Sequence, residues 1–248
     1  MAFYATLPFV FYFVLVELVV GTALAMLLVE PQLEVGPGFL QFMGISVLAT
    51  AGLTLWIGSG LDVSLRPLWA AVAAAAVYTI FAYRPRRVPR IAAGVALAGA
   101  SGAALASGLL GFGPLGPAVT ASFAAASVAM GASMTGMLLG HWYLVAPMLS
   151  SRPLLRLTGL FLLALVGQGA LLVWLMGAAP VPPVLNMMVV MRAAFGIVFP
   201  LVMGGFVLYS CRIRAMRTAT GILYLAVGCV VMGDITAKVL YFLTAVPV

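Results

Sequence analysis

Three ionisable residues stand inside the last two long apolar segments of the chain: Arg192, Asp234 and Lys238. A charge inside a membrane is expensive and is by default a candidate functional site. Asp234 and Lys238 are spaced i, i+4, so they share one face of a helix and can pair within it. At a rise of about 1.5 Å per residue, both fall at a depth close to that of Arg192 and of Gln168 in the preceding segment. The sequence therefore predicts one polar cluster in the outer half of these segments.

This cluster has two interpretations. In the structural one, Asp234 neutralises Arg192 or Lys238 and holds the last two helices together, because charges in membranes pair before they do anything else. In the functional one, the Asp234 carboxylate accepts protons or contacts a quinone, and Arg192 controls its protonation. The pattern of residues leaves both open.

Glu17 and His141 are two further candidates for proton handling. Glu17 lies near the middle of the first apolar segment, whose helix supplies no cation near it. A carboxyl group without a partner at that depth is expected to be protonated or to face a polar cavity. His141, the single histidine, comes just before Trp142 and Tyr143 at the end of the fifth segment. It is either a structural hydrogen-bonding residue or a ligand or proton carrier.

Apolar segments that position these residues recur along the whole chain. Of its 248 residues, 65% are hydrophobic and 7% are charged, and the mean hydropathy is +1.24. These values predict an all-α, polytopic membrane protein with about eight transmembrane helices and a single integral domain, 1–248. Pro200 is expected to kink the seventh helix. The predicted spans are 7–29, 37–59, 66–83, 91–113, 117–139, 153–178, 185–210 and 218–243.

The formal charge of +7 indicates orientation rather than binding to nucleic acid. With eight spans, the loops at 84–90, 141–152 and 211–217 fall on one side of the membrane, whereas the opposite loops hold only Arg66. This asymmetry predicts that both termini face away from the cytoplasm in a bacterial-type inner membrane, with some attraction for anionic lipid. The basic loops carry Arg84, Arg86, Arg87, Arg90, Arg152, Arg212, Arg214 and Arg217.

The two halves of the chain, 1–113 and 117–248, show a weak similarity to each other. Met26–Leu28 parallels Met137–Leu139, and Trp56 parallels Trp174, at offsets of 111 and 118 residues. The basic loop YRPRRVPR parallels CRIRAMRT at an offset of 128 residues. Four spans per half would give two parallel four-helix halves related by an axis along the membrane normal. Chance similarity between apolar segments is the alternative.

The few histidines and cysteines limit the cofactors that the chain could hold. A haem with two histidine ligands needs a second histidine, and covalent haem attachment needs CxxCH, which is absent. Cys211 and Cys229 make no set for zinc, copper or an iron–sulfur cluster. We therefore expect no metal and no covalently bound cofactor, and we expect any redox centre to lie on a partner chain.

Eight spans, short loops, outward termini and two four-helix halves resemble the polysulfide-reductase-type (NrfD-like) membrane anchors of quinone oxidoreductases. The closing segment TATGILYLAVGCVVMGD, followed by TAKVLYF, is similar to the end of such an anchor. The resemblance implies an anchor that carries no cofactor and supplies a quinone pocket and proton-handling residues. It implies partner subunits that hold iron–sulfur clusters, molybdenum or haem. The resemblance covers the architecture and assigns no site residue, so all six candidates come from physical reasoning.

The leading hypothesis is an integral membrane subunit of a respiratory or photosynthetic electron-transfer complex, which binds quinone or serves as a scaffold. Such a subunit is not catalytic alone, and its partners are other membrane or redox subunits and lipid. The alternative is a small proton-coupled transporter or channel, in which the charged residues line a path between the halves. A membrane-embedded enzyme is the weakest hypothesis, because no nucleophile with a base or metal is visible.

Overall fold

The computed structural model describes residues 2–29, 35–84, 87–113, 116–146, 148–178 and 182–247. This part of the chain is all helical, as predicted. Seven helical segments are long and apolar enough to cross a membrane, and the eighth, α3, is shorter, with 16 residues. The elements are α1 (Ala2–Val29), α2 (Pro37–Gly58), α3 (Arg66–Phe81), α4 (Arg87–Leu110), α5 (Pro117–Val145), α6 (Arg152–Ala178), η2 (Pro183–Leu185), α7 (Asn186–Ala193), η3 (Ala194–Val198), α8 (Phe199–Arg212) and α9 (Met216–Thr244).

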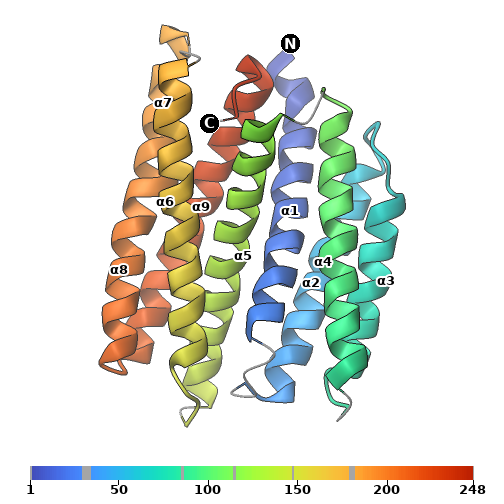
Figure 1. Ribbon diagram of the computed structural model, residues 1–248, viewed down its shortest axis with the longest axis vertical. Coiled ribbons are helices and arrows are strands. Elements are labelled where there is room, and N and C mark those ends of the chain that lie inside the picture. The colour runs from blue at the N-terminus through green and yellow to red at the C-terminus, as the bar shows by residue number, and fades with distance from the viewer. Residues whose placement is uncertain are drawn as a thin grey trace.

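The helices run up and down in one bundle, and α7, η3 and α8 form one continuous span (Figure 1). The first helix begins, and the last helix ends, at the same end of the bundle, which we call the terminal end. The opposite end, which we call the basic end, carries seven of the eight predicted arginines; Arg86 lies outside the described residues. Arg156 in α6 adds to this end, whereas Arg66 opens α3 at the terminal end. Which end faces the cytoplasm stays a prediction.

Each half of the bundle repeats one order of helix contacts. In the first half, α1 packs against α2 and α4, and α3 packs against both of these. In the second half, α5 packs against α6 and α9, and the span from α7 to α8 packs against both of these. This agreement concerns packing only, so the duplication of the sequence stays a prediction.

The two halves meet where α1 crosses α5, and these helices are the most buried spans. Gly21 and Gly131 lie at the crossing. A Cβ atom on Gly21 would overlap the backbone carbonyl of Ser127, and one on Gly131 would overlap the backbone of Gly21. Without a hydrophobic drive between helices in lipid, close backbone approach at small residues is what holds them together. The paired glycines therefore fix the position of one half against the other.

The seventh span, in which Pro200 is predicted to cause a kink, contains a π-helical turn. The turn is η3, directly before α8. Proline has no N–H, so the carbonyl of Gly196 loses its usual partner four residues later. A π turn changes the hydrogen-bond register over these residues, and such turns are frequent at functional sites. This turn begins two residues after Arg192.

Candidate functional site

Lys238 on α9 lies at the centre of a buried group of charged side chains. Its Nζ donates a hydrogen bond of 2.7 Å to Oδ1 of Asp234, one turn earlier on the same helix. The same Nζ lies 2.9 Å from Oε1 of Glu17 on α1. One ammonium group thus bridges two carboxylates that come from opposite ends of the sequence.

Arg192 on α7 completes the charge cluster, the name we give to Glu17, Arg192, Asp234 and Lys238. Its Nη2 donates a hydrogen bond of 2.5 Å to Oε1 of Gln168 on α6, and its charge interacts with both carboxylates. The two acids and two bases sum to a formal charge of zero. Their exposures are 0% for Glu17 and 2% for each of the others, so the charges are balanced inside a region from which lipid and water are excluded.

Two glycines make room for Arg192. A Cβ atom on Gly196 in η3 would lie 2.6 Å from Nη1 of the guanidinium, and one on Gly233 in α9 would overlap Cα of Gly196. The π turn and α9 therefore touch at their backbones, directly beside Asp234. Larger residues at these positions would separate the helices that carry the cluster.

In the described part of the chain, the carboxylates of Glu17 and Asp234 have oxygens that accept no hydrogen bond. Glu17 and Asp234 each place one oxygen against Nζ of Lys238. Among the described residues, Oδ2 of Asp234 has no hydrogen-bond partner, and the contact of Glu17 with Lys238 is an ion pair outside hydrogen-bond geometry. Carboxyl groups that share one cation are coupled, so a proton gained by one changes the charge that the other meets. The arrangement therefore offers two coupled carboxyl groups as candidate proton acceptors in the membrane interior.

Phe123 on α5 covers the cluster on one side. The Nζ atom of Lys238 lies 4.2 Å from the centre of its ring, a geometry in which a cation is attracted to the aromatic face. The ring also packs edge-on against Phe13 and Tyr241, at centroid distances of 5.7 Å and 5.4 Å. These contacts hold the ring of Phe123 over the ammonium group of Lys238.

The structure brings together five of the six predicted residues: Glu17, Gln168, Arg192, Asp234 and Lys238. The helix of Glu17 supplies no cation, as the sequence indicates, but Glu17 is not without a partner, because Lys238 on α9 supplies one. Asp234 pairs with Lys238, which is one of the two partners that the structural interpretation allowed. The pairing alone does not separate the structural from the functional interpretation.

His141 is the predicted residue that the structure leaves apart. It is exposed and lies within α5, which continues to Val145 instead of ending near residue 139. It comes 18 residues after Phe123, or about 27 Å along the helix at 1.5 Å per residue. The neighbouring Trp142 packs against Phe39 on α2, at a centroid distance of 6.0 Å.

Phe123, Gly196 and Gly233 were not predicted as site residues. Phenylalanines and glycines are frequent in every span, so composition could not single out these positions. The net charge of the other three ionisable residues could have indicated that Glu17 pairs with them. Arg192, Asp234 and Lys238 alone sum to +1, and a fourth, negative residue inside a span would complete a neutral set.

We expect Gly233→Ala to lower the free energy of unfolding by about 1–3 kcal/mol, the usual range for overpacking. The added methyl group would press on the backbone of Gly196, which cannot rotate away. Gly228→Ala on the same helix is the control, because a Cβ atom there meets nothing within 4 Å. Unfolding by sodium dodecyl sulfate in mixed micelles measures both variants. Equal stability of the two would contradict the close approach of η3 and α9.

Fold and site together define a polytopic, all-helical membrane protein with a buried, charge-balanced cluster of ionisable side chains between its two halves. No family model, no curated protein and no solved structure matches the chain. In the part of the chain that the structure describes, no three His, Cys, Asp or Glu side chains gather as a metal site would require. The function is therefore inferred from the charge cluster itself.

Proposed function

We propose that the protein is an integral membrane subunit of an electron-transfer complex, in which the charge cluster exchanges protons with a quinone. The bridging of Glu17 and Asp234 by Lys238 is the observation that carries this proposal. Reduction of a quinone consumes protons, and general acid–base groups inside the membrane are needed to deliver them. A carboxyl pair held beside an ammonium group has the chemistry for this step.

Electrons would come from partner subunits. The sequence contains one histidine and two cysteines, which is too few for the common ligand sets of haem and iron–sulfur clusters. The subunit would supply the site and the protons, and its partners would supply the redox centres. Purification from native membranes in a mild detergent is expected to recover redox subunits together with this chain.

The proposal predicts that Glu17→Gln, in the purified complex, lowers quinone-coupled turnover at least tenfold, because a positioned acid or base typically contributes about 10²–10⁴-fold. Reduction of the partners' redox centres by an artificial donor should stay unchanged, since the electron path does not pass through Glu17. His141→Gln is the control, because His141 is exposed and remote from the cluster. Unchanged quinone turnover in a folded Glu17→Gln complex would overturn the proposal.

The second candidate is a proton-coupled transporter, and the ion pair between Glu17 and Lys238 is the observation that favours it. This pair joins α1 of the first half to α9 of the second, so protonation of Glu17 would loosen the contact between the halves. Proteoliposomes that contain only this chain separate the two candidates. Proton-dependent solute flux that Glu17→Gln abolishes would establish transport, whereas the electron-transfer subunit is expected to show none.

A further inference from the structure

A second feature of the bundle, separate from the charge cluster, is an apolar groove between α4 and α5. These helices follow each other in the chain but have at most a weak contact with each other, because each packs on α1 instead. Figure 1 shows α1 between them. The lateral groove has α1 as its floor and a volume of about 240 Å³. Its lining includes Val20 on α1, Gly102 and Leu105 on α4, and Thr120, Phe123 and Ser127 on α5.

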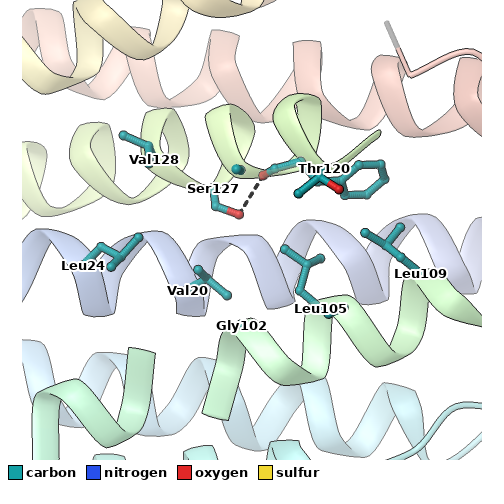
Figure 2. Close-up of a pocket in the computed structure, with 11 residues that line it drawn as sticks. Val20, Leu24, Gly102, Leu105, Leu109, Thr120, Ser127 and Val128 are labelled. Atoms are coloured by element: carbon teal, nitrogen blue, oxygen red, sulfur yellow. Dashed lines mark hydrogen bonds between the residues drawn. The ribbon is translucent and has the colours of Figure 1, made fainter. Parts of the chain in front are cut away.

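The residues that line the lateral groove offer no unpaired polar group to an occupant. Its two hydroxyl groups are satisfied within their own helix: Ser127 donates to the carbonyl of Phe123 at 2.8 Å, and Thr120 donates to the carbonyl of Gly116 at 3.1 Å. Figure 2 shows the first of these bonds at the edge of the groove. All other lining side chains are hydrocarbon or absent. The occupant is therefore apolar along its whole contact.

The size and direction of the lateral groove favour a single hydrocarbon chain. On α5 it extends from Thr120 to Val128, about 12 Å along the helix, so its length follows the bilayer normal as lipid chains do. Drug-sized ligands take pockets of about 300–1,000 Å³, which exceed it.

We infer that the lateral groove is a binding site for one acyl chain of a bilayer phospholipid, which enters sideways between α4 and α5. The groove lies within membrane-spanning segments, so phospholipid chains are the medium around it. Phe123 both lines the groove and covers Lys238. A bound chain thus packs against the same ring that shields the charge cluster. The inference is independent of the proposed function, since it concerns lipid contact alone.

Photolabelling tests the site in liposomes of phosphatidylcholine that carries a diazirine on one acyl chain. We expect the label on peptides of α4 and α5 that line the groove at least fivefold above the label on an exposed face of α6. That face carries Val166 and Val173, which are exposed and lie at a depth similar to that of the groove, so it reports the background of ordinary lipid contact. Equal labelling of the groove and the α6 face would overturn the inference.

Gly102→Leu fills the lateral groove and should lower its labelling at least fivefold. The variant is expected to fold, because a Cβ atom on Gly102 meets nothing within 4 Å. Gly99→Leu is the matched control: it lies on the same helix, has the same open space, and does not line the groove. Labelling that survives Gly102→Leu, displacement of the label by a prenyl quinone at a few mole per cent, or a cross-link from the groove to another polypeptide would each contradict an acyl-chain site.

Discussion

Lys238→Met is expected to lower the free energy of unfolding by about 3–5 kcal/mol, the loss that follows when one partner of a buried ion pair is removed. Methionine keeps a side chain of similar length but no charge. Glu17 and Asp234 would then lose the ammonium group that lies 2.9 Å and 2.7 Å from their oxygens. The cluster would change from a formal charge of zero to −1 in a region that excludes water. Unfolding by sodium dodecyl sulfate in mixed micelles measures the loss.

The control for Lys238→Met is Arg217→Met, the same kind of change at an exposed position on the same helix. The free energy of unfolding of Arg217→Met should stay within about 0.5 kcal/mol of that of the unaltered protein. The double variant Glu17→Gln/Lys238→Met restores a neutral cluster of Arg192 and Asp234, so we expect it to recover at least half of the loss. Coupling of this kind is what a double-mutant cycle measures. Simple additivity of the two changes would show that packing, and not charge, makes Lys238 important.

Gly131→Ala is expected to have the second large effect. It should lower the free energy of unfolding by about 3 kcal/mol or more, at the upper end of the range for overpacking. Its added methyl group would overlap the backbone of Gly21, where α1 and α5 cross. Backbone atoms in the middle of a helix cannot move aside as a side chain does. The two halves would have to separate, and this would also lengthen the contact between Glu17 and Lys238.

Gly136→Ala on the same helix is the control for the crossing. A Cβ atom there would lie 3.6 Å from Leu154 and 3.9 Å from Leu223, which are ordinary contacts with flexible side chains. We expect its stability to change by less than about 1 kcal/mol. Comparable losses in both variants, measured in the same micelles, would contradict the assignment of Gly131 to the crossing between the halves.

Helix boundaries beside proline–glycine turns were well predicted, because such turns act locally. The second span, predicted at 37–59, is α2 at Pro37–Gly58, and it begins with the proline that favours a first helical position. The fifth span was predicted too short, because His141 and Trp142 ended the apolar window while the backbone remained helical to Val145. Polar and aromatic residues at a membrane boundary end the hydrophobic run without ending the helix.

The sequence by itself determined that the chain crosses the membrane repeatedly, that its positive residues gather at one end, and that Asp234 and Lys238 can pair. These properties follow from composition and from the helical repeat, which are local. Only the tertiary structure decided that Glu17 forms an ion pair with Lys238 and that Arg192 donates a hydrogen bond to Gln168. It also decided that α4 and α5 leave a groove between them. These features depend on which helices lie side by side. That choice rests on close backbone approaches such as the one between Gly21 and Gly131, which no single segment can reveal.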